Sequence, residues 1–473
     1  MTGRDPVDHA THVDLVVVGG GISGLAAAWE AVVGGATVAV LEAGDRFGGR
    51  IRTSALSLTD GEVPIDEGAD AFLARSPGAV ELCRELGLDA DLVEPATGRA
   101  RVWIDGELRP LPEHHVLGVP IDADDLAGTG ILSDRSVDAV RREVDRTDPG
   151  PTEDVAIGAY LTDHFDRELV DHLVGPLIGG INAGDVDRLS LDAVTPQLAE
   201  AAHTGGSLVR TLRDRRAATA ATGPVFHGLR GGTGTLVDAL VDALRERGAV
   251  LVTEAEVREL RSEDDGSTVV VTAARTFSAR GVVLAVPADV AANLIEPTCP
   301  DAAEDLGRIE YTSVTLVTFV FRRDDVPGPL DGSGFLVPRD AGLFLTAASW
   351  GSSKWAHWDD GRHVILRVSA GHSGDRRVEQ LDDDVVARRL LADLRTTMGI
   401  DAPPVTIRVS PWPRGFAQYH VGHLDRVDRI EQALARDLPQ VRVTGAAYRG
   451  LGIPACITQG RRAARDLLAT PLG

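Results

Sequence analysis

Apolar and polar positions near the N-terminus follow a strand–helix–strand order. Residues 13–18 (VDLVVV) are aliphatic apart from Asp14, which is typical of a strand buried on both faces. Residues 25–31 (LAAAWEA) consist mainly of helix formers, and residues 37–41 (TVAVL) form a second short apolar run. The pattern therefore predicts two strands joined by a helix.

The middle of the chain has helical periodicity. Apolar residues recur at helical spacing in residues 81–92, 134–146 and 156–180. A polar segment with two prolines, residues 145–155, separates two of these runs. We therefore expect residues 81–215 to be mainly helical.

The rest of the chain combines both patterns. Residues 226–260 predict a turn, a helix and a strand, residues 281–290 a further strand, and residues 305–420 a series of strands at 313–321, 333–338, 363–371 and 405–412. The fold is predicted to be α/β, with three domains. They are a Rossmann-like domain assembled from discontinuous segments (residues 1–80, 216–295 and 421–473), a mixed β-sheet domain that binds substrate (296–420) and an inserted helical domain (81–215).

A glycine fingerprint lies between the first predicted strand and helix. Gly19, Gly21 and Gly24 have the G-x-G-x-x-G spacing, which permits a tight turn, close approach to a pyrophosphate and close helix–strand packing. The helix start would direct free N–H groups and a positive dipole end at that phosphate. Glu42 follows Gly24 by 18 positions, near the spacing of an acid that binds a ribose hydroxyl. This arrangement predicts a dinucleotide site, with NADP disfavoured by the acid.

Further glycine-rich segments indicate that this dinucleotide is a flavin. Gly48 and Gly49 permit another close backbone approach, and Arg50 can neutralise pyrophosphate charge. Residues 443–464 form a second glycine-rich turn that opens a C-terminal helix, and residues 251–257 could line an adenine pocket. We therefore predict non-covalent FAD. Its predicted contacts are Gly19, Gly21, Ile22, Ser23, Gly24, Glu42, Ala43, Gly48, Gly49, Arg50, Val257, Gly445, Gly452 and Ile453.

Composition excludes several other classes of protein. The 473 residues carry a net charge of −23, which argues against nucleic-acid binding and against adhesion to anionic lipid. No apolar run approaches the length of a membrane span and no signal-peptide core is present, so we expect a cytoplasmic protein, free or peripheral to the membrane. The three cysteines, Cys83, Cys299 and Cys456, match no metal or disulfide framework, and no metal is expected.

Several motifs in order resemble one family. VVGGGISGLAAA, GGRIRT, IDEGADAFLARSP, GPLIGGINAGDVDRLSL, LVPRD, ASWGSSKWAHW and YRGLGIPACITQGRRAA together resemble the protoporphyrinogen/coproporphyrinogen oxidases of haem synthesis, in their Gram-positive, coproporphyrinogen-using form. The first and last motifs are shared with amine oxidases and carotenoid desaturases, whereas residues 175–191 and the SSKW segment are more specific. The resemblance implies a monoamine-oxidase-like flavoprotein that oxidises coproporphyrinogen III to coproporphyrin III, with oxygen as acceptor and hydrogen peroxide as by-product.

The resemblance also implies where the substrate binds. Gly179, Gly180, Ile181, Asn182 and Ala183 would form a turn facing the macrocycle, with a backbone carbonyl accepting pyrrole N–H groups. An ordinary helix cap and turn is the alternative. Leu336, with Val337, and Trp350 would contact the ring faces, with core packing as the alternative. Arg99 or Arg101 would bind a propionate, with an exposed arginine as the alternative, and Asp185 is expected to cap a turn.

The chemistry is expected to centre on the flavin, and we identify no catalytic side chain. The resemblance allows a transient contact with the next enzyme of haem synthesis. The alternatives are a protoporphyrinogen IX oxidase, a flavin amine oxidase, a carotenoid desaturase or a scaffold without turnover. Lys354, the sole lysine, lies in SSKW rather than in an amine-oxidase context. Cys456 lies in GIPACI, which differs from the SGGC-type motif of covalent flavin attachment.

Overall fold

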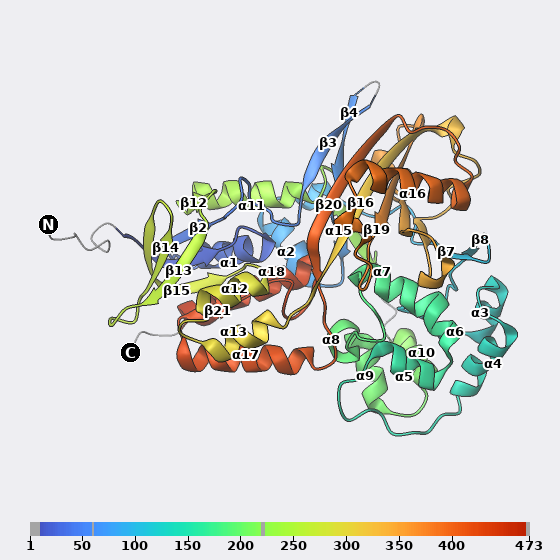
Figure 1. Cartoon of the computed structure of the whole chain (residues 1–473), viewed down its shortest axis with the longest axis horizontal. Coiled ribbons are helices and arrows are strands. Elements are labelled where there is room, and N and C mark those ends of the chain that lie inside the picture. Colours follow the sequence, from blue (N-terminus) through green and yellow to red (C-terminus); the bar gives the residue numbers. More distant parts are fainter. Residues whose placement is uncertain (1–9, 59–60, 219–222, 470–473) are drawn as a thin grey trace.

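The structure is a computed structural model that describes residues 10–58, 61–218 and 223–469. One end of the molecule is a sheet covered by helices on both faces (Figure 1). The other end consists of a second sheet and, beside it, a group of helices.

A seven-stranded sheet forms the first part. Its strand order is β12-β2-β1-β15-β14-β13, with β21 beside β15. β1 is parallel to β2 and β15, β12 is parallel to β2, and β21 is parallel to β15. β14 is antiparallel to both of its neighbours, β13 and β15. The strands span Thr11–Val18 (β1), Val38–Leu41 (β2), Val250–Val252 (β12), Val257–Ser262 (β13), Thr268–Thr272 (β14), Thr276–Leu284 (β15) and Val441–Val443 (β21). Three distant stretches of sequence therefore build one sheet.

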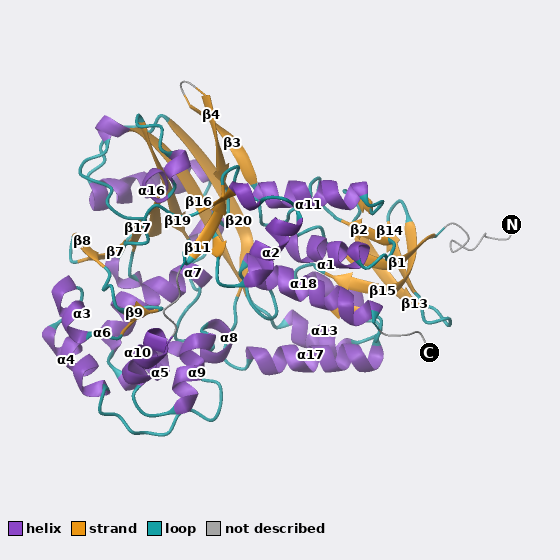
Figure 2. Cartoon of the chain, turned by 180° about the vertical axis from the view of Figure 1, so that it is seen from behind, coloured by secondary structure: helices purple, strands orange, loops and turns teal. Residues whose placement is uncertain are grey.

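Alternate residues of β1 face two separate hydrophobic cores. Leu15 and Val17 pack in the core that contains α1, α2, α11 and α18, whereas Val16 and Val18 pack in the core that contains α12, α13 and α17. Figure 2 shows these two groups of helices on opposite sides of the sheet. Burial of β1 on both faces explains its nearly unbroken aliphatic sequence. The helices span Ile22–Val33 (α1), Pro77–Glu85 (α2), Gly234–Glu246 (α11), Ala288–Ile295 (α12), Pro300–Gly307 (α13), His423–Asp437 (α17) and Ile453–Leu468 (α18).

A second seven-stranded sheet has the order β20-β16-β19-β18-β17-β7-β8. Val364, Leu366 and Val368 of β19 face a core with α16 (Asp383–Met398), so Arg367 faces the opposite side. The strands span Ala100–Ile104 (β7), Glu107–Pro110 (β8), Tyr311–Arg322 (β16), Gly334–Leu336 (β17), Leu345–Trp350 (β18), His363–Ala370 (β19) and Thr406–Ala417 (β20).

The remaining helices form the third part around their own core. They span Ala123–Thr129 (α3), Asp134–Glu143 (α4), Ile157–His164 (α5), Arg167–Leu169 (α6), Val170–Gly179 (η3), Gly180–Asn182 (α7), Leu191–Val194 (α8), Pro196–Thr204 (α9) and Leu208–Ala218 (α10). Short elements connect the parts. They span Thr53–Leu58 (β3), Gly61–Asp66 (β4), Phe72–Leu73 (β5), Leu92–Val93 (β6), His115–Val116 (β9), Val119–Pro120 (β10), Phe226–Leu229 (β11), Gly351–Lys354 (α14), Arg377–Gln380 (α15), Asp89–Asp91 (η2), Arg323–Asp325 (η4), Arg339–Ala341 (η5) and Ala356–Trp358 (η6).

One strand prediction was wrong, and one helical range also contains strands. The strand predicted over 281–290 ends at Leu284, and α12 begins at Ala288, because Pro287 cannot donate a hydrogen bond to a neighbouring strand and suits a helix start instead. The range 81–215, predicted to be mainly helical, also contains β7 and β8 at the edge of the second sheet. That edge position depends on pairing with β17, more than 200 residues later, which local periodicity cannot reveal.

Among the described residues, no helix is long and apolar enough to cross a membrane.

Candidate active site

The two ends of the chain meet where α1 and α18 begin. Gly460 of α18 packs on the backbone of Ser23 in α1, and a Cβ on Gly445 would lie 3.8 Å from Ser23 Oγ. Ile22 and Ile453, the first residues of the two helices, are both buried. Two helix N-termini, each with unpaired N–H groups, are therefore brought close to the same glycine-rich turn.

The three fingerprint glycines have different reasons to lack a side chain. A Cβ on Gly19, whose φ is +101°, would lie 2.5 Å from the Ala285 carbonyl oxygen, and one on Gly24 would lie 2.0 Å from the Gly19 oxygen. A Cβ on Gly21 would meet only Gly49 Cα, at 4.0 Å. The protein itself therefore requires glycine at 19 and 24, whereas position 21 is left open as a pyrophosphate would need.

Glu42 is fixed at the carboxyl end of β2. Its Oε2 accepts a hydrogen bond from Gly20 N at 2.7 Å and its Oε1 accepts one from Gly44 N at 2.8 Å. This places a carboxylate directly beside the fingerprint turn, as ribose recognition requires. Ala43 is exposed next to it, and Val257 at the start of β13 is buried in the adjacent core.

Arg50 is a desolvated cation without a carboxylate partner among the described residues. Its Nη2 donates to the Arg414 carbonyl oxygen at 2.7 Å, and its guanidinium lies 5.8 Å from the centre of the Tyr311 ring. Burial lowers the pKa of Arg50, and the neighbouring Arg414 adds to this effect. Gly48 and Gly49, with φ of +105° and +56°, precede it, and Gly48 forms a bridge with Gly21. A pyrophosphate would supply the missing negative charge, so these residues fit FAD.

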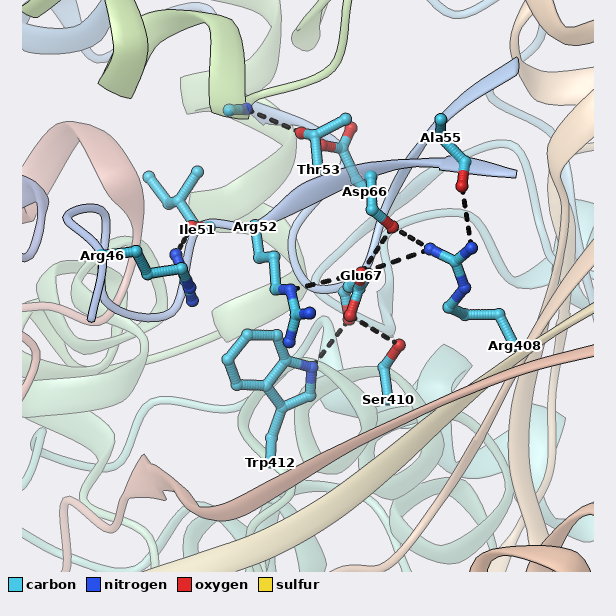
Figure 3. A network of polar contacts seen from close by, with 12 residues as sticks. Arg46, Ile51, Arg52, Thr53, Ala55, Asp66, Glu67, Arg408, Ser410 and Trp412 are labelled. Atoms are coloured by element: carbon cyan, nitrogen blue, oxygen red, sulfur yellow. Dashed lines mark hydrogen bonds and ion pairs between the residues drawn. The ribbon is translucent and has the colours of Figure 1, made fainter. Parts of the chain in front are cut away.

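A buried carboxylate ties this segment to the second sheet (Figure 3). Glu67, which is 5% exposed, accepts hydrogen bonds from Ser54 Oγ at 2.5 Å and Ser410 Oγ at 3.2 Å. Arg52 and Arg408 form ion pairs with it at 3.4 and 3.5 Å, and its carbonyl oxygen accepts from Trp412 Nε1 at 2.7 Å. The GGRIRT segment is thereby held against β20.

Asp66 has a structural role beside this network. Its Oδ1 accepts hydrogen bonds from Thr53 Oγ1 at 2.6 Å and from the backbone N–H and the hydroxyl of Thr233, both at 2.8 Å. Burial raises the pKa of Asp66, although these hydrogen bonds oppose the shift. Asp66 thus satisfies the N-terminus of α11.

Lys354 is committed to a buried ion cluster. Its Nζ donates to both oxygens of Asp70, at 3.1 and 3.0 Å, and Arg367 Nη1 lies 2.9 Å from Asp70 Oδ2. Trp355 Nε1 donates to the same oxygen at 2.9 Å. Burial alone would raise the pKa of Asp70, but the two cations hold it well below its usual range. The sole lysine is therefore neutralised by a carboxylate.

The predicted turn at residues 179–183 is largely helical. η3 is a π-helix over Val170–Gly179, α7 continues it to Asn182, and only Ala183 has a left-handed φ, of +47°. The prediction of a glycine-rich turn was therefore wrong, because Gly179 and Gly180 adopt ordinary helical φ values of −62° and −63°. π-helical turns often occur at functional sites.

Gly180 and Leu336, two residues of the predicted substrate site, lie close together. A Cβ on Gly180 would lie 3.5 Å from Leu336 Cδ2, an ordinary contact distance, so neither backbone nor packing requires glycine here. Ile181 next to it is 58% exposed. Trp350, by contrast, is 3% exposed and packs with Phe335 in the core on the α16 side of the sheet, which favours the packing alternative for that residue.

The arginines expected to bind a propionate differ in what already holds them. Arg101 donates to both oxygens of Asp331 at 2.9 Å and to the Leu108 carbonyl oxygen at 3.1 Å. Arg99 is exposed, and its carbonyl oxygen accepts hydrogen bonds from the backbone N–H and the hydroxyl group of Ser333. Arg101 is therefore committed to the sheet, and Arg99 remains the candidate of the two.

Two expectations about single residues agree with the local geometry. Asp185 Oδ1 accepts a hydrogen bond from Asp187 N at 3.1 Å, as a turn cap does. Cys456 is 5% exposed and its Sγ contacts the Gly450 and Leu451 carbonyl oxygens, at 3.8 and 3.7 Å. Burial raises the pKa of this thiol to about 11, which keeps it protonated and unreactive at neutral pH.

A family model for flavin-containing amine oxidoreductases matches residues 22–468. The chain belongs to this family. The match covers the fingerprint helix, the second sheet, all strands of the first sheet except β1, and the C-terminal helix, and it confirms the predicted flavin cofactor, FAD, and the predicted α/β fold class.

Curated relatives are similar over nearly their full length. The coproporphyrinogen III oxidase of Bacillus subtilis is 31% identical over 96% of this chain and 97% of the relative. The enzymes of the same name from Propionibacterium freudenreichii and Mycobacterium leprae are 33% and 34% identical, over 100% and 96% of this chain and 94% and 98% of the relatives. The resemblance inferred from the motifs is thereby confirmed.

Solved structures agree in fold. A protein from Exiguobacterium, provisionally named a protoporphyrinogen oxidase, has a TM-score of 0.86 at 30% identity, covering 97% of this chain and 99% of that one. A variant of putrescine oxidase has a TM-score of 0.69 at 21% identity, covering 98% and 100%. The second similarity is one of fold alone.

Sequence reasoning missed two residues whose side chains bind the backbone of the 179–184 segment. Arg339 Nη2 donates to the Gly184 carbonyl oxygen at 2.7 Å, and Gln418 Nε2 donates to the Asn182 carbonyl oxygen at 3.1 Å. Arg339 lies in the quoted LVPRD motif, only three positions after Leu336. Its position after this candidate residue was the one available signal, whereas Gln418 had none.

Proposed function

We propose that this protein oxidises coproporphyrinogen III to coproporphyrin III in haem synthesis, with FAD as cofactor, oxygen as electron acceptor and hydrogen peroxide as by-product. One observation carries the proposal: relatives named coproporphyrinogen III oxidase share 31–34% of their residues with this chain over almost its whole length. The glycine at position 180 supports it, because neither backbone nor packing requires glycine there and a flat ring needs a site without a side chain.

The residues at the meeting point of α1 and α18 would hold FAD. Glu42 would accept from the ribose, Arg50 would pair with the pyrophosphate beside Gly21, and the N-terminus of α18 at Gly452 and Ile453 would stabilise negative charge on the ring. When bound, FAD supplies the oxidising power by accepting a hydride from a carbon that bridges two pyrroles.

The chain's own contribution is to orient and enclose the macrocycle. Carbonyl groups near Gly180 would accept hydrogen bonds from the pyrrole N–H groups, and Leu336 would lie against a ring face. Neither needs to titrate, which agrees with the lack of a candidate acid–base side chain. Arg99 would meet a propionate at the rim.

The assay is oxidation of three substrates by purified protein loaded with FAD. We expect porphyrin fluorescence and peroxide to appear with coproporphyrinogen III, more slowly with protoporphyrinogen IX, and peroxide to be absent with amines. A clear preference for protoporphyrinogen IX would show that it is the substrate in place of coproporphyrinogen III. Turnover of amines alone would show that the protein is an amine oxidase. Colourless protein that takes up no FAD would refute the proposal outright.

A flavin amine oxidase is the second candidate, and the fold allows it. Amine oxidation in this fold commonly uses a lysine that orients water near the flavin. Here Lys354 is paired with Asp70 and stacked 5.1 Å from the Trp355 ring centre. This commitment of the sole lysine favours the porphyrinogen oxidase. We further propose that the protein is cytoplasmic, free or peripheral to the membrane, and contacts the next enzyme of the pathway transiently.

A further inference from the structure

Three consecutive carbonyl groups that follow the π-helix accept hydrogen bonds from three different elements. The Asn182 oxygen accepts from Gln418 Nε2 at 3.1 Å, and the Ala183 oxygen accepts from Ser373 N at 2.7 Å. The Gly184 oxygen accepts from Arg339 Nη2 at 2.7 Å. Residues 182–184 are therefore fixed from outside, next to Gly180 and its neighbour Leu336.

The segment includes the end of a helix, since α7 stops at Asn182. Besides helical backbone bonds, Gly184 N donates to the Gly179 oxygen at 3.1 Å and Asn182 Nδ2 donates to the Ile178 oxygen at 2.8 Å. Ala183 adopts φ +47°, a conformation unfavourable for a residue with a Cβ, so surrounding contacts must maintain it. The external donors supply those contacts.

Gln418 is poorly explained by stability alone. It is 2% exposed, directly after β20, and its Oε1 has no hydrogen-bond donor among the described residues. Its Nε2 bonds the Asn182 oxygen and, at 3.3 Å, the Phe416 oxygen. An apolar side chain of the same size would avoid the unsatisfied acceptor, so this amide has a cost that its bonds to the Asn182 and Phe416 oxygens must offset. Of these two bonds, only the one to Asn182 reaches a distant part of the chain.

Arg339 links the two sides of the proposed ring site. It begins η5, three residues after Leu336, and reaches the far side of the 179–184 segment. Its Nη1 also lies 3.4 Å from Asp185 Oδ2, so a carboxylate already balances its charge. This guanidinium is committed to the chain rather than free for a substrate propionate.

We propose that Arg339 and Gln418 are positioning residues that hold the Gly179–Gly184 segment at the distance from Leu336 that the tetrapyrrole core requires. The inference rests on the proposed function. Under this proposal, neither Arg339 nor Gln418 contacts the peripheral groups of the substrate. Removing either donor should therefore affect coproporphyrinogen and protoporphyrinogen alike, since both share the same tetrapyrrole core.

The test compares Arg339→Ala, Arg339→Lys and Gln418→Met with the wild type, each loaded with FAD. Gln418→Met removes both the donor and the unsatisfied acceptor at similar volume, so unfolding stability should be kept while activity falls. We expect kcat/KM to drop about tenfold or more for both porphyrinogens, as misplacement by a fraction of an ångström allows. FAD affinity should stay unchanged, and Arg339→Lys, which can still donate to Gly184, should recover most of the activity.

Arg395→Ala is the matched control, because Arg395 pairs with Asp401 at 2.6 Å at an exposed position near the end of α16. Variants at 339 and 418 that behave like this control would overturn the inference. So would a changed ratio of the two substrates in Arg339→Ala, which would mean direct contact with a carboxylate. Wild-type protein that oxidises neither porphyrinogen would instead remove the proposed function itself.

Discussion

Gly460 of α18 lies directly on the carbonyl group of Ser23 in α1: a Cβ at position 460 would be 2.0 Å from that oxygen. This contact joins segments more than 400 residues apart and sets how closely the two helices approach. Because both helices begin at the proposed FAD site, their separation also sets the geometry of that site.

Gly460→Ala is expected to destabilise the protein by about 1–3 kcal/mol, since the added methyl group forces the two helices apart. FAD should be bound more weakly as well. Gly128→Ala in α3 is the control, because a Cβ there meets no atom within 4 Å and should be neutral or slightly stabilising. Urea unfolding of both apoproteins measures the difference, and equal stability of the two variants would contradict the packing argument.

Gly21→Ala and Gly24→Ala should separate cofactor binding from folding. Gly21 has φ −71° and no close neighbour, so alanine fits the fold, but its methyl group would occupy the proposed pyrophosphate position. We expect a folded Gly21→Ala protein that retains little FAD, seen as lost absorbance near the flavin bands. Gly24→Ala should fail to fold, because of the 2.0 Å approach to Gly19 O. Full flavin content in Gly21→Ala would exclude this site.

Gly180→Ala and Gly180→Leu probe the substrate face. Alanine is tolerated by the 3.5 Å distance to Leu336, so both folding and FAD content should stay at the wild-type level. Because the added carbon atoms project where the ring is proposed to lie, we expect KM for coproporphyrinogen to rise with alanine and turnover to be abolished with leucine. Steady-state kinetics on FAD-saturated enzyme measures this, and wild-type kinetics in Gly180→Leu would place the substrate elsewhere.

Asp70→Asn should cost about 3–5 kcal/mol of unfolding free energy, because it leaves Lys354 and Arg367 without their buried counter-ion. Asp138→Asn removes an exposed partner of Arg141 and should cause no measurable change in the free energy of unfolding. Each variant replaces one carboxylate by an amide, so chemical denaturation compares the loss at a buried site with the loss at an exposed site. Similar losses in both would show that the cluster around Asp70 is well solvated.

His423 should make stability depend on pH. Burial lowers its pKa to about 4, and its Nε2 lies 2.8 Å from the Tyr448 oxygen while its ring stacks 3.9 Å from that of Tyr419. Between pH 4 and 6.5 the unfolded chain binds a proton at this histidine and the folded chain does not. The folded state therefore loses up to about 3 kcal/mol as pH falls through that window.

The check for His423 is the unfolding free energy of apoprotein at pH 7, 5.5 and 4.5, in wild type and in His423→Asn. We expect a smaller decline in the variant, because asparagine does not titrate in this range. Parallel decline in the two proteins would mean that other groups cause the pH dependence.

The nucleotide-binding part and its motifs could be predicted because they are encoded locally. A strand buried on both faces must be aliphatic, so residues 15–18 can be recognised from their sequence, and Gly24 is required by its contact with Gly19 five residues earlier. Gly19 is recognisable through the fingerprint spacing, although the atom that excludes a side chain there belongs to Ala285. The same holds for Glu42, which follows the second strand. These elements and their order come from the sequence by itself.

Tertiary structure decided which residues meet. Gly460 is required because α1 packs against it, and Lys354 is neutralised because Asp70 lies beside it. The position of residues 182–184 depends on hydrogen bonds from Ser373, Arg339 and Gln418. No short-range pattern encodes a partner more than 100 residues away. The helical periodicity of residues 156–180 reached Gly179 and Gly180, but the sequence could not decide between that helix and a glycine-rich turn, because glycine allows several backbone conformations and its surroundings select one.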